Sequence, residues 1–203
     1  MKQKHFVSLL GLLAIVAASV PSAMAAEENT GFYIGGNVGQ SDAKQVCDGV
    51  TISCDKKDTA WKLFAAYQFN QNFGVEVGYS DLGKSTVSGV ITGVSINGSG
   101  TAKAWELVGI GAFPVADKFS LYGKLGVYQA KTDVSATGVV PGFAVSVSAS
   151  DTNTDWTAGF GAMYDINRNV GVRAEWQRYN KVGGDKTGKS DVDVLGIGLL
   201  YRF

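Results

Sequence analysis

Residues 61–79 read WKLFAAYQFNQNFGVEVGY, and this stretch decides the fold. Apolar residues occupy every second position up to Phe69 and again from Phe73, with mainly small or polar residues between them. A period of two is typical of a β-strand with one apolar face. The intervening residues 70–72, Asn-Gln-Asn, form a short polar turn. The stretch therefore predicts a β-hairpin whose two strands each present a continuous apolar face.

The same alternation recurs along the chain and defines eight strands. Apolar side chains mark every second position in residues 32–38, 61–69, 73–79, 105–113, 119–127, 156–164, 170–176 and 195–203. The opposite positions carry mostly Gly, Ala, Ser, Gln and charged residues, which fit the narrow interior of a small barrel better than a sandwich core. We therefore expect an all-β protein, an eight-stranded antiparallel up-and-down transmembrane β-barrel.

A soluble lipocalin-like barrel is the alternative fold. It is disfavoured because the outward positions include Trp61, Trp105, Trp156 and Trp176, which a soluble protein would bury. Beyond the N-terminus the sequence also lacks the run of about 20 apolar residues that a membrane helix needs. A closed barrel is then the remaining structure able to cross a bilayer.

Short and long connections alternate between the expected strands. The short ones cover residues 70–72, 114–118 and 167–169, and the long ones cover residues 41–58, 82–103, 131–155 and 180–190. In an outer-membrane barrel the short turns face the periplasm and the long loops face outward, so both termini are expected on the periplasmic side. Aromatic residues near strand ends suit an interfacial girdle, namely Phe69, Phe73, Phe113, Phe119 and Tyr164.

The N-terminus predicts export. Two lysines precede a short apolar stretch, and Ala23 and Ala25 form the small-x-small pattern of a signal-peptidase site. A membrane anchor is the alternative, disfavoured because the apolar run is short and ends at a cleavage site. We expect residues 1–25 to be a removed secretory signal and residues 26–203 to be the barrel domain.

Composition limits the chemistry of the chain. The 203 residues contain 18 Lys and Arg, 18 Asp and Glu and one histidine, His5, which lies in the expected signal. A net charge of zero argues against a nucleic-acid-binding protein. Without a histidine, the usual hydrolase triads and zinc sites lack their base or ligand. We expect no enzyme activity, no metal and no cofactor.

Cys47 and Cys54 lie in the first long connection. An exported chain meets an oxidising compartment, which favours a disulfide between them over a metal site. Closing so short a loop stabilises by about 2.5 kcal/mol in the chain-entropy model, enough to shape the loop but not to decide whether the barrel folds.

The second and third long connections keep the strand pattern. In residues 86–102 and 133–150, Val, Ile or Phe alternates with Ser, Thr or Gly. We infer that these strands continue beyond the membrane as a protruding sheet, the alternative being two flexible loops. The exposed edge of such a sheet offers unpaired backbone groups to a partner strand, which is a route to adhesion.

Three segments carry a family resemblance: KLFAAYQFNQNFGVEVGYSDLG (62–83), GIGAFPVADKFSLYGKLGVYQAK (109–131) and GVRAEWQRY (171–179). They resemble the transmembrane domain of OmpA-type proteins and related small barrels, and the protruding sheet is similar to that of OmpX-like barrels. The resemblance implies an integral protein of the Gram-negative outer membrane. The sequence stops at the last strand, so we expect no peptidoglycan-binding domain of the OmpA type.

The C-terminal residues LGIGLLYRF (195–203) resemble the assembly signal of this family. The resemblance implies that the outer-membrane assembly machinery, with periplasmic chaperones, reads this end of the chain. The residues expected to matter most are Phe203, Tyr201 and Leu199.

The resemblance also implies two crossing ion pairs inside the barrel. Glu76 and Arg173 match one pair, whereas Ile110 and Met163 stand at the positions of the other. Apolar packing replaces that second pair, and losing both partners together avoids a buried unpaired charge. The other inward charges expected to join the remaining pair are Glu106, Lys124 and Glu175.

Three functions remain open at this point. The favoured one is a structural and surface-interaction role in adhesion or defence, exercised through the extracellular loops toward a host or cell-surface ligand. The second is a narrow porin-like channel gated by the Glu76–Arg173 pair. The third is a carrier of hydrophobic small molecules, disfavoured by the polar lumen. We expect a monomer surrounded by outer-membrane lipid and lipopolysaccharide, whose phosphates Lys181, Lys186 and Lys189 could contact.

Overall fold

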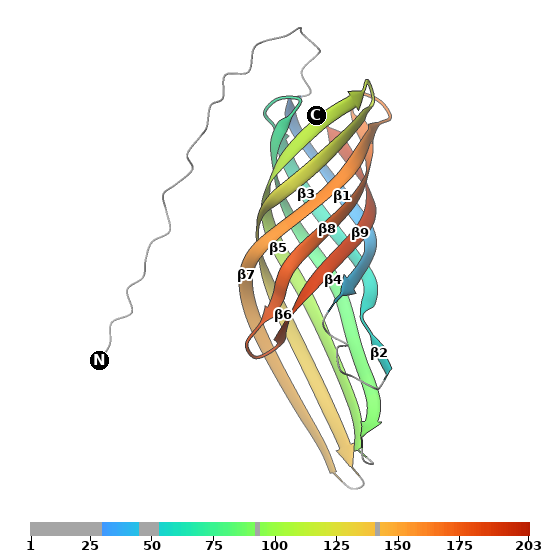
Figure 1. Ribbon diagram of the computed structural model, residues 1–203, viewed down its shortest axis with the longest axis vertical. Coiled ribbons are helices and arrows are strands. Elements are labelled where there is room, and N and C mark those ends of the chain that lie inside the picture. The colour runs from blue at the N-terminus through green and yellow to red at the C-terminus, as the bar shows by residue number, and fades with distance from the viewer. Residues whose placement is uncertain (1–29, 45–52, 92–93, 141–142) are drawn as a thin grey trace, which may run out of the picture.

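Eight long antiparallel strands close into one barrel (Figure 1). The computed structural model describes residues 30–44, 53–91, 94–140 and 143–203. Its strands are β1 (Gly31–Ala43), β2 (Ser53–Asp55), β3 (Lys57–Gln68), β4 (Phe73–Ile91), β5 (Val94–Ala116), β6 (Phe119–Val140), β7 (Phe143–Asp165), β8 (Val170–Gly184) and β9 (Gly188–Arg202). The long strands pair in chain order, β9 pairs with β1 to complete the ring, and the short β2 pairs with β4 outside it. The expected up-and-down barrel is confirmed.

The alternation in the sequence sets which side chains face outward. In β3, Leu63 is 59% exposed whereas the neighbouring Lys62 is 5% exposed, and the same contrast continues along the strand. Strand β5 carries apolar residues on both faces, and closure of the ring places Val108 and Ile110 inside and Trp105 and Leu107 outside. The barrel therefore has an apolar belt on its exterior and a mixed, tightly packed interior.

Aromatic residues mark both borders of the apolar exterior. At the end with the short turns the exposed rings are those of Phe69, Phe73, Phe113, Phe119, Tyr164, Tyr201 and Phe203. Toward the other end Tyr79 packs between Trp61 and Trp105, with ring centroids 5.8 and 4.9 Å away. Phe69 directly follows β3 and is eight residues from Trp61. At about 3.3 Å per residue and a tilt of about 40°, this separation gives a height of roughly 20 Å. This height suits the hydrocarbon core of an outer membrane.

Two expected connections are shorter than the sequence indicated. Strand β5 continues past a bulge at Pro114 to Ala116, leaving only residues 117–118 as the turn. The expected long loop at residues 180–190 is wrong, because β8 and β9 extend to a tight hairpin with residues 185–187 at its tip. Gly183 (φ 99°) and Gly188 (φ 77°) adopt the left-handed conformation that this tight turn requires.

Strands β4, β5, β6 and β7 extend well beyond the rest of the barrel, at the lower end in Figure 1. Their pairing continues through residues 86–91, 94–102, 133–140 and 143–150, so the inferred protruding sheet is present among the described residues. Among the residues that the structure describes, there is no helix long and apolar enough to cross a membrane.

Candidate functional site

A layer of six charged side chains fills the middle of the barrel interior. Three cations and three carboxylates come from inward positions of β3, β4, β5, β6 and β8, namely Lys62, Glu76, Glu106, Lys124, Arg173 and Glu175. All six are at most 5% exposed. Equal numbers of opposite charges make the layer neutral overall, which a low-dielectric interior requires.

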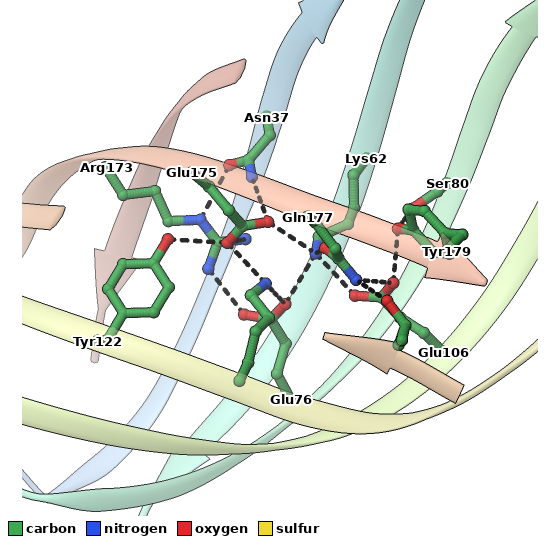
Figure 2. Close-up of polar contacts among 12 residues, drawn as sticks. Asn37, Lys62, Glu76, Ser80, Glu106, Tyr122, Arg173, Glu175, Gln177 and Tyr179 are labelled. Atoms are coloured by element: carbon green, nitrogen blue, oxygen red, sulfur yellow. Dashed lines mark hydrogen bonds and ion pairs between the residues drawn. The ribbon is translucent and has the colours of Figure 1, made fainter. Parts of the chain in front are cut away.

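Glu76 is the centre of the charge layer, as Figure 2 shows. Arg173 donates from Nη1 to one carboxylate oxygen of Glu76 (2.7 Å). Lys124 and Lys62 approach the other oxygen at 3.0 and 3.1 Å. Three cations therefore surround one fully buried carboxylate, and the expected Glu76–Arg173 contact is one part of this larger arrangement.

The two remaining carboxylates complete the network on either side of Glu76. Glu106 accepts hydrogen bonds from Lys62 (2.7 Å) and Tyr179 (2.6 Å). Glu175 contacts Lys124 at 2.6 Å and accepts a hydrogen bond from Tyr122 at 2.8 Å. Glu106 and Glu175 thus each have both a cation and a neutral donor. The arrangement satisfies the conditions under which buried charges are tolerated.

The sequence placed Lys62 and Gln177 in the polar lumen but did not include them, or several neutral residues, among the groups expected to join the ion pair. Lys62 is the most important, since it approaches Glu76, Glu106 and Glu175 together. Its inward position in the period-two pattern was the available signal. The neutral groups that complete the network are Asn37, Ser80, Tyr122, Thr157, Gln177 and Tyr179 (Figure 2).

Apolar layers cover the charges from both ends. Toward the short turns lie Tyr33, Phe64, Ala66, Ile110, Tyr122, Met163 and Leu200. Ile110 and Met163 pack there as the sequence predicted for an apolar replacement of an ion pair. The Arg173 guanidinium lies 3.5 Å from the ring centroid of Phe64, a cation–π contact that joins the charged layer to this one.

The layer toward the protruding sheet consists of Ala43, Leu82, Ala102, Ala104, Tyr128, Ala130, Tyr179, Val182 and Val192. The rings of Tyr128 and Tyr179 meet edge to face with centroids 5.3 Å apart. Between the layers, beside Lys62, Glu175 and Gln177, the cavity has a volume of about 20 Å³, room for a single water molecule. The described residues thus close the lumen by packing.

The protruding sheet has two chemically different faces. On the outer face, Ser99, Ser135 and Ser148 pair across three strands. On the inner face the side chains of β7 are apolar, and Phe143, Val145 and Val147 are 48–66% exposed. One edge of the sheet is partly covered by β2, which pairs with residues 86–88 of β4. On the other edge, β8 pairs with β7 only from Thr157 onward.

The remaining predicted site residues are placed as follows. Leu199, Tyr201 and Phe203 face outward on or just beyond β9, and the rings of Tyr201 and Phe203 pack 5.3 Å apart. Cys54 lies in β2, but Cys47 is outside the described residues, as are Ala23 and Ala25. The expected disulfide and signal cleavage therefore stay predictions.

A closed eight-stranded barrel with an apolar belt, aromatic borders and a packed charged interior is an integral β-barrel of the Gram-negative outer membrane. Comparison with known proteins agrees. The chain belongs to the family described as outer membrane protein beta-barrel domain, whose model matches residues 10–203.

Among curated relatives, outer membrane protein A of Yersinia pseudotuberculosis is 30% identical over 94% of this chain and 53% of its own length. Outer membrane protein A of Serratia marcescens is 27% identical over 96% of this chain and 55% of its own length. The chain thus spans about half the length of these relatives.

Among solved structures, Ail of Yersinia pestis, crystallised with the heparin analogue sucrose octasulfate, has a TM-score of 0.54 and 21% identity. That match covers 86% of this chain and 99% of Ail. OprG of Pseudomonas aeruginosa has a TM-score of 0.50 and 18% identity, covering 85% of this chain and 96% of OprG. At these identities the likeness concerns the fold.

Proposed function

We propose that this barrel is a surface-interaction protein, and that its protruding sheet captures an extended segment of a protein on another surface by adding it to the edge of β7. The packed lumen supports this assignment over a channel, because charged and apolar layers fill the interior from strand to strand. The portion of the molecule beyond the membrane is then where interaction takes place.

The edge of β7 is the observation that carries the proposal. Strand β6 pairs with β7 along its whole length, whereas β8 pairs only with residues 157–165. The β8–β9 hairpin reaches β7 at Asp151, whose carboxylate accepts hydrogen bonds from the backbone N–H groups of Lys186 and Thr187. Within the described chain, residues 143–150 have no strand on that side.

This edge lacks the usual protection against pairing. Natural edge strands are blunted by charges, proline or bulges. Residues 143–150, FAVSVSAS, contain neither charge nor proline, and their pairing with β6 is regular. A partner strand would gain main-chain hydrogen bonds from the edge and apolar contact with Phe143, Val145 and Val147 on the inner face.

Chemistry also points to a protein partner in preference to a sulfated sugar. Ail was crystallised with a sulfated heparin analogue. On the outer face of this sheet Lys84 stands in a groove lined otherwise by Asp133 and small residues, mostly serine and threonine. The neighbouring outward row places Lys103 opposite Lys131 and Asp81, and Lys131 lies 3.9 Å from Asp133. Two aspartates therefore stand among the three lysines of this face, which weakens its attraction for sulfate groups.

The proposal can be tested with a peptide that copies residues 133–140, the segment that already pairs with the other edge of β7. We expect the fluorescein-labelled peptide to bind the refolded barrel in lipid vesicles with a rise in anisotropy. The Ser148→Lys variant places a charge on the edge strand and should lose binding. Ser99 lies in the same cross-strand row as Ser148, but on β5, which is paired on both sides. Ser99→Lys therefore makes the same change away from the edge and serves as the matched control.

Adhesion is measured in parallel. Bacteria that display the wild type or Ser99→Lys should attach to cultured epithelial cells, and bacteria that display Ser148→Lys should not. Equal peptide binding by the two lysine variants, or equal attachment of both strains, would contradict the proposal.

A further inference from the structure

A second cavity, open to the outside, lies at the protruding end, separated from the charge layer by the apolar layer that contains Tyr128 and Tyr179. Its volume is about 380 Å³, within the range of ligand pockets. We call it the outer cup. Its floor is formed by Leu82, Ala102, Val182 and Val192, which belong to the apolar layer toward the protruding sheet. Its walls are the inner face of the protruding sheet and residues 187–190 of the β8–β9 hairpin.

The lining of the outer cup is neutral. Among the described residues that line it, Lys189 is the one charged side chain, and it is paired with Asp185 at 2.9 Å. The hydrogen bond from Lys189 lowers the pKa of the exposed Asp185 carboxyl, so the pair stays charged at the rim. The other polar groups are hydroxyls, including those of Ser41, Ser85 and Ser190. A charged ligand would have no counter-ion inside.

One lining residue has unused hydrogen-bonding capacity. Thr132 is 9% exposed, and its hydroxyl has no hydrogen-bond partner among the described residues. A rotation of about 120° about its χ1 moves the hydroxyl to the position of the methyl group, and the methyl group to that of the Cβ hydrogen. A buried hydroxyl without a partner is costly, so a ligand that satisfies it gains affinity.

We propose that the outer cup binds a small uncharged amphipathic molecule, with an apolar body on the floor and one hydrogen-bonding group at Thr132. The ligand enters and leaves through the outer mouth, because Tyr128 and Tyr179 close the floor. The site is therefore a receptor for a molecule outside the cell and not a carrier path. It is independent of the β7 edge, so either proposal can fail alone.

The test uses the barrel in lipid nanodiscs with labelled leucine and valine methyl groups, titrated with 1-decanol as the probe. We expect saturable chemical-shift changes at Leu82, Val87, Val182 and Val192, which line the cup. Leu63 and Leu125 face the lipid and report simple partitioning of decanol into the bilayer. Their shifts should grow without saturation.

Two variants connect the shifts to the cup. A Cβ at Gly100 would meet its nearest neighbour, Val134, at 3.6 Å, so Gly100→Leu can fill the cup and should abolish the saturable shifts. Gly111→Leu, at an open position on the exposed outer face, is the matched control and should bind normally. Thr132→Val should weaken decanol binding by about 3- to 10-fold, the loss of one neutral hydrogen bond.

Gly98→Leu, at a second open position in the wall, replaces Gly100→Leu if the latter does not fold. Several outcomes overturn the proposal: no saturable shift in the wild type, equal saturable shifts in the filled variant, or decanol affinity unchanged in Thr132→Val. Cross-relaxation between the cup methyls and protons of residues 45–52 without decanol would identify the chain itself as the occupant and would equally overturn it.

Discussion

Glu76→Gln should strongly destabilise the barrel. The substitution removes one carboxylate from a layer of three cations and three carboxylates and leaves one buried positive charge without compensation. Arg173, Lys124 and Lys62 all lie within 3.1 Å of the Glu76 carboxylate. The two carboxylates that remain, Glu106 and Glu175, already contact these cations, so no unused carboxylate can neutralise the freed charge. Breaking a buried pair on one side costs about 3–5 kcal/mol. We expect a loss of this size.

The double variant Glu76→Gln/Arg173→Met separates charge balance from general damage. It leaves two cations and two carboxylates, so the charge layer is neutral again. The methionine side chain keeps apolar contact with Phe64, over which the Arg173 guanidinium lies. We expect the double variant to recover at least half of the stability lost in Glu76→Gln. Asp133→Asn, which removes a carboxylate with a side chain 55% exposed in the protruding sheet, is the matched control and should change stability by less than about 0.5 kcal/mol.

The assay is equilibrium unfolding by urea in lipid vesicles, followed by tryptophan fluorescence and by the mobility of unboiled samples on gels. All variants should show the same denaturant slope, so that midpoints can be compared. A loss below about 1 kcal/mol in Glu76→Gln would refute the reasoning, because it would mean that water or a structural shift neutralises the freed charge. Additive losses in the double variant would do the same.

Three further outcomes are expected. In planar bilayers the folded wild type should give no discrete current steps, and stable steps that change in Glu76→Gln would show an open path through the charge layer. Mass spectrometry after alkylation without reductant should find neither Cys47 nor Cys54 modified, whereas one alkyl group on each would exclude the disulfide. Phe203→Ala should slow assembly in cells, seen as unfolded monomer on unboiled gels, while refolding in detergent stays near wild type because the ring is exposed; equal defects in both would indicate a packing role instead.

Much of the fold could be predicted because the period of two fixes the face of each side chain. Lys62, Glu76 and Arg173 alternate with lipid-facing residues, so their inward direction follows from the sequence. Their contacts do not follow, since the stagger between strands decides which inward residues meet. Lys62 reaches Glu106 and Glu175 across the barrel only in the register observed.

The β8–β9 hairpin was mispredicted for a related reason. Residues 180–190 are rich in Gly and Lys, a composition typical of a loop. The extension depends on the carboxylate of Asp151, more than 30 positions earlier, which binds the backbone at the tip. Local composition carries no sign of such a contact.

The pairing of β9 with β1 has a consequence for the order of events in biogenesis. Eleven residue pairs join β1 to β9, so β1 has no partner on that side until β9 has been translated and exported. Until then two strand edges expose amide and carbonyl groups that hydrocarbon cannot satisfy. Insertion and closure must therefore be nearly simultaneous, and a chain halted before residue 188 would be excluded from the bilayer altogether, not inserted as a smaller barrel.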